Sequence, residues 1–275
     1  MDDYFWRWVR WMSFDNFVDK MKSVNGTFGE IGGCNEWAAF YSTYTLIMIS
    51  CANFLKKKIY RVGLKILIVA NILVLMFTFS RGGWVAFLVG LSYLLIVKKK
   101  YFVLGILLCL PLVYTVILPT AVTERIDMSF ATNDYGDTAD QDVESRLTMW
   151  KIAGQQILQS PVFGQGFFSF RYGHWNNPHN QHLNILVQGG IIGYSLFLWV
   201  IFAMYREARL LVRIGQTQLT QSFGQGICAS IISLFVANFF GDRWSYYVIT
   251  GYLWVLVSFV IILIRSDLRS NEVNS

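Results

Sequence analysis

Long uncharged stretches alternate with short charged segments along the chain. They cover residues 37–55, 66–80, 82–97, 101–123, 183–205, 214–241 and 244–264. A helix needs about 20 apolar residues to cross a hydrocarbon core of about 30 Å, so most of these stretches can span a bilayer. The two shortest reach spanning length if the basic residues beside them extend to the membrane surface. The pattern predicts an all-α fold, a polytopic transmembrane helix bundle with about seven spans.

The same pattern divides the chain into five parts. These are an external interfacial arm (1–36), four transmembrane helices (37–119), an external loop (120–182), three transmembrane helices (183–264) and a cytoplasmic tail (265–275). Apolar residues in the external loop recur at helical spacing and predict a short helix that ends at Pro161. They are Leu147, Trp150, Ala153 and Ile157. A loop of this length in a compact membrane protein is typical of a functional segment.

Composition and charge agree with a membrane protein. The chain has 275 residues, of which 55% are hydrophobic and 15% charged, against roughly a quarter charged in soluble domains. Its net charge of +6 comes from basic clusters at alternate helix ends, which the positive-inside rule places in the cytoplasm. The clusters are Lys56, Lys57, Lys58 and Arg61; Lys98, Lys99 and Lys100; Arg206, Arg209 and Arg213; and Arg265 and Arg269. The charge therefore indicates a lipid bilayer as partner and no nucleic acid.

Arg81 is the first residue that could carry chemistry. It lies within Ser80-Arg81-Gly82-Gly83-Trp84, between two apolar stretches. A guanidinium at that place needs water, a cavity or an anion, and the adjacent glycines would let an anionic ligand approach. The alternative is an arginine that extends into the lipid headgroups.

Arg146 and Trp150 form a second candidate pair in the external loop. They are four residues apart, so on a helix the guanidinium can lie over the indole ring. The pair could bind a ligand, or it could be an exposed arginine packed on a tryptophan. Asp242 and Arg243, which lie between two apolar stretches, are predicted to form a surface turn.

The three histidines of the chain, His174, His179 and His182, fall within nine residues. They could ligate a metal, but the spacing matches no common zinc pattern and no carboxylate lies close in sequence. One of them could instead act as a general base, which suits an ordinary pKa of about 6.5. A third interpretation is that they are polar residues where Pro178 and Asn180 start a helix.

Taken together, three segments of the chain resemble the O-antigen ligase and polymerase superfamily in order and placement. The first segment is 80–84. The second combines Ser145-Arg146 and Trp150 with Ser160-Pro161-Val162-Phe163-Gly164-Gln165-Gly166. The third runs from Pro178-His179-Asn180-Gln181-His182-Leu183 into Gln188-Gly189-Gly190. Upstream, Asn25-Gly26-Thr27-Phe28-Gly29 is similar to the segment that enters an earlier span of the family.

The resemblance implies a metal-independent glycosyltransferase without a cofactor. Such an enzyme would polymerise undecaprenyl-pyrophosphate-linked repeat units into a surface polysaccharide, with its active site on the external, periplasmic face of the bacterial inner membrane. Arg81 and Arg146 would then hold the pyrophosphate, and His179 would be the base that deprotonates the acceptor hydroxyl. The predicted substrate-binding residues are completed by Trp150, Gly164, Gly166 and His182.

Other functions stay open at this stage. The nearest alternative is an O-antigen ligase, which would transfer a lipid-linked glycan to lipid A core or to protein, and the motifs do not separate it from a polymerase. A membrane transporter or a non-catalytic scaffold is a further alternative. Members of the superfamily usually have more spans, so we expect either a truncated or split member of the superfamily or a partner chain that supplies the missing N-terminal helices.

Overall fold

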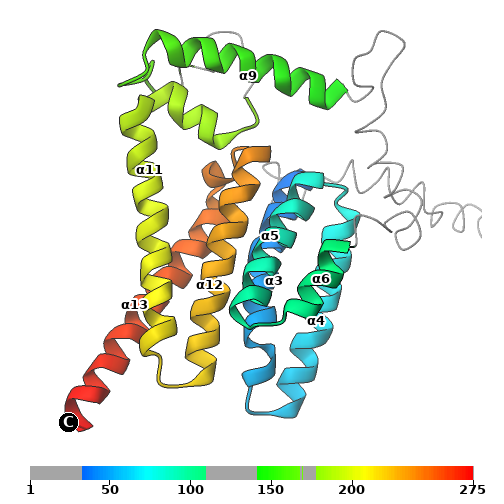
Figure 1. Ribbon diagram of the computed structural model, residues 1–275, viewed down its shortest axis with the longest axis vertical. Helices are drawn as coiled ribbons and strands as arrows, with labels where there is room; N and C mark the ends of the chain where they lie inside the picture. Colours follow the sequence, from blue (N-terminus) through cyan, green and yellow to red (C-terminus); the bar gives the residue numbers. More distant parts are fainter. Residues whose placement is uncertain (1–32, 110–140, 168, 170–177, 275) are drawn as a thin grey trace, which may run out of the picture.

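The computed structural model describes residues 33–109, 141–167, 169 and 178–274. These residues form helices and turns and contain no strand, which confirms the all-α class (Figure 1). The α-helices are α3 (Cys34–Cys51), α4 (Lys58–Phe77), α5 (Arg81–Val97), α6 (Tyr101–Cys109), α9 (Gln141–Gln159), α11 (Gln181–Ile214), α12 (Gln218–Ala237) and α13 (Tyr247–Asn274). Short 3-10 helices follow α3 and connect α12 to α13: η2 (Ala52–Phe54), η4 (Asn238–Phe240) and η5 (Arg243–Ser245).

Four of the described helices are long and apolar enough to cross a membrane. They are α4, α11, α12 extended to Phe240, and α13 up to Leu268. Helix α5 is apolar but has 17 residues. The chain is thus a membrane protein, while the predicted number of seven spans stays a prediction. The predicted division into five parts is also untested, because residues 1–32 and 110–140 lie outside the described residues.

Helices α3, α5 and α12 pack closely because glycines of α5 and α12 lie directly against α3. A Cβ added to Gly90 of α5 would lie 2.3 Å from Leu46 Cδ1 of α3, and one added to Gly226 of α12 would lie 2.8 Å from Ile47 Cα. The Ser230 hydroxyl also donates a hydrogen bond of 2.6 Å to the Thr43 carbonyl oxygen. Small residues and hydroxyl groups of this kind drive helix association where lipid surrounds the bundle.

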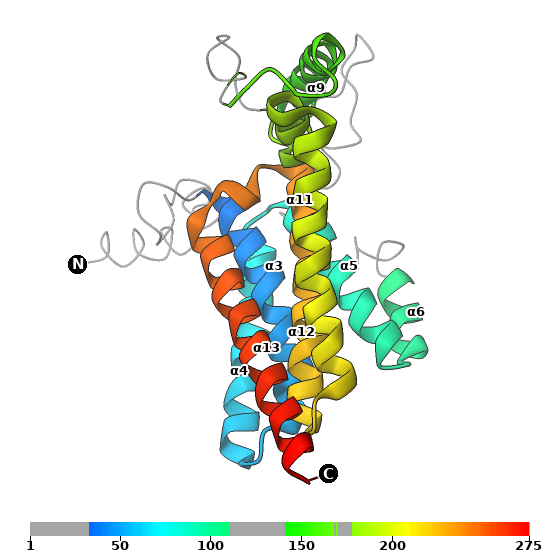
Figure 2. The same cartoon turned by 90° about the vertical axis from the view of Figure 1, so that its left-hand side faces the viewer.

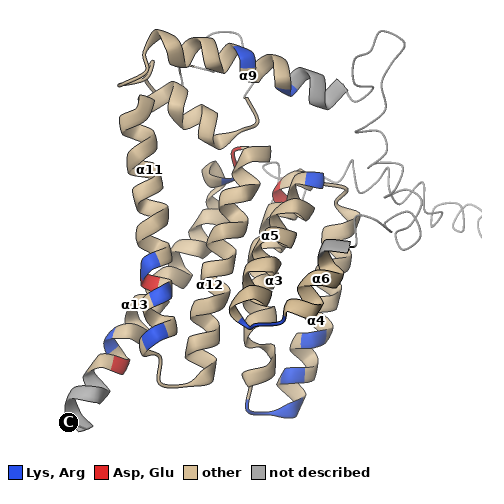
Figure 3. Cartoon of the chain, in the orientation of Figure 1, with Lys and Arg blue, Asp and Glu red and all other residues tan. Residues whose placement is uncertain are grey.

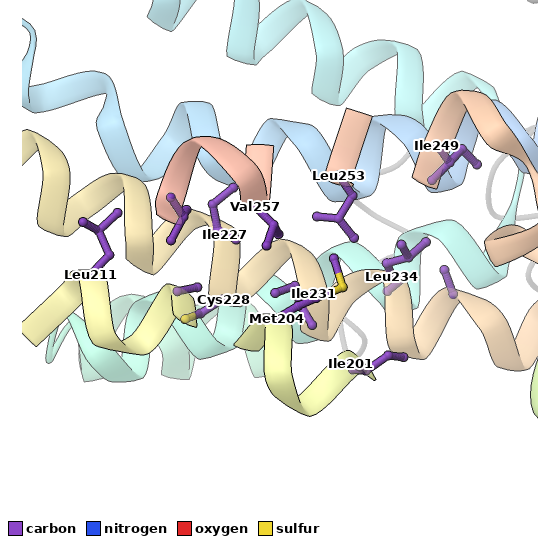
Figure 4. Close-up of a cluster of buried hydrophobic side chains, with 14 of the residues drawn as sticks. Ile201, Met204, Leu211, Ile227, Cys228, Ile231, Leu234, Ile249, Leu253 and Val257 are labelled. Atoms are coloured by element: carbon purple, nitrogen blue, oxygen red, sulfur yellow. The ribbon is translucent and has the colours of Figure 1, made fainter. Parts of the chain in front are cut away.

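A second packing region joins α11, α12 and α13. Met204 and Leu211 of α11, Ile227 and Leu234 of α12, and Leu253 of α13 are buried together (Figure 4). The three helices therefore share one apolar core along their length.

The two ends of the bundle differ in their charged residues. Lysines and arginines of the α3–α4 and α5–α6 connections, of the second half of α11 and of the last turns of α13 gather toward one end, the basic end (Figure 3). The other end, the α9 end, holds α9, the N-termini of α3 and α5, and the α12–α13 connection (Figures 1 and 2). This separation is what the positive-inside rule leads us to expect.

Helix α9 lies across its end of the bundle and packs on the first turns of α11. Ala153 of α9 and Val187 of α11 are both fully buried at this contact, beside Met149, Ile152 and Leu183. Helix α9 is the helix that the sequence predicts before Pro161. Its packing fixes Arg146 and Trp150 close to the start of α11.

Candidate active site

A break in α11 shapes the α9 end. Gly190 has φ 59° and ψ −160°, a conformation that interrupts the helix, and the backbone of the turn after α9 bonds to this break. Gln165 N donates to Val187 O at 2.7 Å, Gly166 N donates to Gln188 O at 3.0 Å, and Ile191 N donates to Pro161 O at 2.9 Å. The turn thus satisfies backbone groups that the broken helix would leave unpaired.

Two glycines allow this contact. Gly164 and Gly190 both have positive φ values, 71° and 59°, which side chains rarely tolerate. A Cβ on Gly164 would lie 2.4 Å from Gln188 O, and one on Gly190 would lie 2.3 Å from Val162 O. The structure therefore gives these glycines a packing role. Substrate binding by Gly164 and Gly166 stays a prediction.

Replacing Gly190 by alanine should destabilise the fold by at least about 1–3 kcal/mol, the usual cost of a strained backbone conformation, because the added Cβ also meets the Val162 carbonyl. Gly189→Ala is a matched control, since a Cβ there meets nothing within 4 Å and alanine favours a helix by up to about 1 kcal/mol over glycine. Unfolding in mixed detergent micelles measures both. Equal stability of the two variants would contradict the packing role.

Hydrogen bonds at the start of α11 fix the location of His179. The Asn180 side-chain oxygen caps α11 by accepting from His182 N at 3.0 Å and from Leu183 N at 3.2 Å. Trp150 Nε1 donates to the Pro178 carbonyl oxygen at 2.9 Å, which ties α9 to the residue before His179. His179 itself has φ 49° and lies at an exposed position, with its ring partly covered by the surrounding protein. A non-glycine residue in this conformation is uncommon and often lies at a functional site.

Charges from three parts of the structure act on His179. Desolvation by the surrounding protein lowers the pKa of His179 below 6.5, and the Arg146 guanidinium of α9 acts in the same direction. Asp242 then raises the pKa of His179, Arg243 lowers it, and Glu36 of α3 raises it. The fold thus brings His179 and Arg146, two residues predicted from the sequence, into one electrostatic environment.

The α12–α13 connection differs from the predicted surface turn. Asp242 and Arg243 are buried, with 9% and 5% of their surfaces exposed. Arg243 Nη1 donates to Glu36 Oε1 in a buried ion pair, and Arg243 Nη2 donates to Phe240 O at 3.2 Å. Glu36 Oε2 also accepts from Gly33 N at 2.7 Å. The connection is buried because it folds back onto the start of α3, which the sequence does not reveal.

Removing the cation of this ion pair should be costly. Arg243→Met should lower the free energy of unfolding by about 3–5 kcal/mol, because it leaves the Glu36 carboxylate buried without its partner. In the double variant Glu36→Gln/Arg243→Met neither charge remains, so part of the stability should return. Unfolding in mixed micelles measures these two variants and the single variant Glu36→Gln. If the double variant loses as much free energy of unfolding as the two single variants together, the two charges do not stabilise each other.

Arg81 begins α5 at the same end of the bundle. Ser80 precedes it, accepts from Gly83 N at 3.4 Å and donates to Asn35 Oδ1 at 2.7 Å. The two glycines after Arg81 do not leave the open approach that the sequence suggests. A Cβ on Gly82 would lie 2.4 Å from Phe240 Cβ, and one on Gly83 would lie 2.4 Å from Ala38 Cβ. Neighbouring elements fill that space, so the glycines serve close packing of α5.

His182 is buried among aromatic rings, with 3% of its surface exposed. The rings of Tyr194, Phe197, Phe235 and Phe239 surround it at centroid distances of 4.1–6.0 Å. Its Nε2 lies 3.1 Å from Phe235 O, and its Nδ1 lies 3.3 Å from the Tyr194 hydroxyl. A carbonyl only accepts, so Nε2 must carry the proton of that bond. This position favours a role in fixing the start of α11, and substrate binding by His182 stays a prediction.

Other parts of the predicted site remain open. His174 lies outside the described residues, and an Arg146 guanidinium stacked on the Trp150 indole stays a prediction. Among the described residues, no group of three histidine, cysteine, aspartate or glutamate side chains is arranged to hold a metal ion. The predicted metal independence is not tested by this arrangement.

The fold and the site define a helical membrane protein with a cluster of charged residues and a histidine at one end of its bundle. The comparisons with known proteins then show what the chain is similar to. The family model described as O-antigen ligase matches residues 66–198, which confirms the resemblance found in the sequence. The chain is similar to this family across residues 66–198, the segment that holds Arg81, Arg146 and His179.

Two curated proteins are similar to the chain. A protein of Rickettsia typhi named "Putative polysaccharide ligase" is 25% identical over 76% of this chain and 52% of its own length. A protein of Rickettsia felis with the same name is 24% identical over 45% of this chain and 33% of its own length. The chain thus spans about half of the first relative and a third of the second. Both names describe a polysaccharide ligase, and neither describes a polymerase.

Proposed function

We propose that the chain is a membrane glycosyltransferase of the ligase type, which transfers a glycan from a lipid pyrophosphate to an acceptor hydroxyl. The observation that carries the proposal is the contact between α9 and the start of α11: Trp150, one helical turn after Arg146, donates to the Pro178 carbonyl oxygen next to His179, and the Arg146 charge acts on His179. An arginine can bind a phosphate by two parallel hydrogen bonds, and a histidine with a pKa below 6.5 is neutral, and therefore basic, at neutral pH.

In the proposed reaction, the acceptor hydroxyl attacks the anomeric carbon of the donor glycan. A new glycosidic bond forms, the bond from that carbon to the pyrophosphate oxygen breaks, and the hydroxyl proton moves to His179. The lipid pyrophosphate leaves as an anion, whose charge Arg146 and Arg81 stabilise. The donor would be an undecaprenyl-pyrophosphate-linked glycan, and the acceptor lipid A core or a protein.

The proposed location is the bacterial inner membrane, with the α9 end on the periplasmic face. The collection of lysines and arginines at the opposite end supports this orientation, because short basic connections stay in the cytoplasm. A cysteine at Ser245 should then react with a membrane-impermeant thiol reagent in intact spheroplasts, while one at Lys99 should not. Labelling at Lys99 alone would reverse the orientation.

The ligase proposal is tested by the products of the purified chain in proteoliposomes. With a lipid-pyrophosphate oligosaccharide and lipid A core, a ligase joins one donor glycan to each acceptor and gives no product without acceptor. A ladder of glycan lengths formed from donor alone would favour the polymerase. Transfer that EDTA abolishes and zinc or magnesium restores would contradict the metal-independent mechanism.

A further inference from the structure

The segment from the last two residues of α9 to residue 167 exposes apolar side chains that the proposed chemistry does not use. We name residues 158–167 the aromatic turn. Leu158, Phe163 and Phe167 are 80%, 77% and 79% exposed, and Val162 is 46% exposed. The sequence carries no charged residue from 152 to 170. Contiguous exposed apolar surface on a folded protein marks a protein or membrane contact.

The aromatic turn is continuous with the lipid-facing surface of α11. Ile191 N donates to Pro161 O, and Ile192 N donates to Val162 O at 3.3 Å. Ile192 also begins a stripe of exposed apolar residues at helical spacing on α11, which continues with Leu196 at 60% and Trp199 at 66% exposed. Because α11 is long and apolar enough to cross a membrane, this stripe faces lipid. The backbone hydrogen bonds hold the aromatic turn at the top of the same surface.

The length of α11 gives the depth of the turn within narrow bounds. At 1.5 Å per residue, Ile191 lies about 22 Å along the helix from Arg206 and about 33 Å from Arg213. One of these two arginines marks the border of a hydrocarbon core that is about 30 Å thick. Relative to the other border of this core, Ile191 therefore lies between about 8 Å inside the hydrocarbon and about 3 Å outside it. A tilt of α11 would place it deeper.

We propose that the aromatic turn inserts into the leaflet at the α9 end and anchors α9 at the height of the lipid headgroups. Apolar aromatic side chains without nearby charge suit this boundary. The consequence for catalysis, which rests on the proposed function, is that Arg146 and His179 are held level with the pyrophosphate of a membrane-embedded donor. The insertion itself does not depend on that function.

The test measures which solvent surrounds residue 163. The four native cysteines are replaced by alanine, and a nitroxide is attached to Phe163→Cys in the full chain, reconstituted in vesicles of phosphatidylethanolamine and phosphatidylglycerol. Collision with oxygen, which concentrates in lipid, is compared with collision with a water-soluble nickel chelate. Trp199→Cys on α11 provides the lipid control, and the exposed Lys151→Cys on α9 provides the reference position at headgroup height, outside the hydrocarbon core.

We expect the ratio of oxygen to nickel collisions at residue 163 to exceed that at residue 151 and to approach that at residue 199. Quenching by lipids brominated near the headgroup should affect a fluorophore at residue 163 more than one at residue 151. A ratio at 163 equal to that at 151 would overturn the proposal. If residue 163 is protected from the nickel chelate only after a polyprenyl pyrophosphate is added, the surface binds the donor chain. If labels of two copies show dipolar broadening, the surface binds a second copy. Either result would also overturn the proposal.

Discussion

Replacing His179 by alanine should lower kcat for glycan transfer by about 10²–10⁴, the usual contribution of a general base. The acceptor hydroxyl then has no side chain to take its proton, while donor binding through the arginines should stay intact. Steady-state transfer in proteoliposomes measures kcat and KM separately. A loss confined to KM would contradict the role of His179 as base.

The pH dependence gives a second sign of this role. Desolvation and the Arg146 charge lower the pKa of His179, so the neutral, basic form should persist below pH 6.5. The acidic limb of kcat/KM should therefore lie below pH 6.5. Asp242→Asn removes a charge that raises the pKa of His179 and should move this limb to lower pH. His182→Ala serves as a control, because it empties a buried aromatic site and should reduce stability without moving the limb.

Replacing Arg146 by alanine should cost about 3 kcal/mol or more in kcat/KM, which is a loss of at least about 100-fold, the scale of one preorganised charge contact. Arg81→Ala should have a loss of similar size if both guanidinium groups bind the pyrophosphate. Lysine at either position should restore activity only in part, because an ammonium group cannot form the paired hydrogen bonds of a guanidinium.

The exposed Lys151 offers a matched control on the same helix. Lys151→Ala removes one positive charge from α9 and should leave kcat/KM nearly unchanged. If Lys151→Ala and Arg146→Ala lower kcat/KM equally, the positive charge of α9 attracts the anionic donor in a general way, and a specific contact of Arg146 does not explain the loss. Full activity of Arg146→Lys would contradict the two-bond geometry.

Much of the fold could be predicted from the sequence, because uncharged stretches of spanning length require helices in a bilayer. The helix of the external loop also followed from local signals, since its apolar spacing and Pro161 define α9. The capping position of Asn180, which starts α11 next to His179, is a local signal of the same kind. These features depend on residues close together in the chain.

The missed features depend on residues far apart in the chain. Glu36 and Arg243 are 207 residues apart, and nothing in their spacing predicts that the α12–α13 connection folds onto the start of α3. The local sequence around Gly82 and Gly83 suggests open space for an anion, because it does not reveal their packing partners, Phe240 and Ala38. A charged residue close to an apolar span was the available signal for Glu36 and Arg243, since such a charge usually needs a partner.

In the proposed function, a lipid pyrophosphate binds at the α9 end, where Arg146 and Arg81 hold it next to His179. The most direct test of this binding uses a polyprenyl-pyrophosphate donor with a photoreactive diazirine on the first sugar. After illumination in proteoliposomes, mass spectrometry should find the crosslink in the peptides that contain Arg146 or His179, and excess unlabelled donor should suppress it. Crosslinks confined to the basic end, at residues 98–100 or 206–213, or spread evenly along the chain despite competition, would contradict this site.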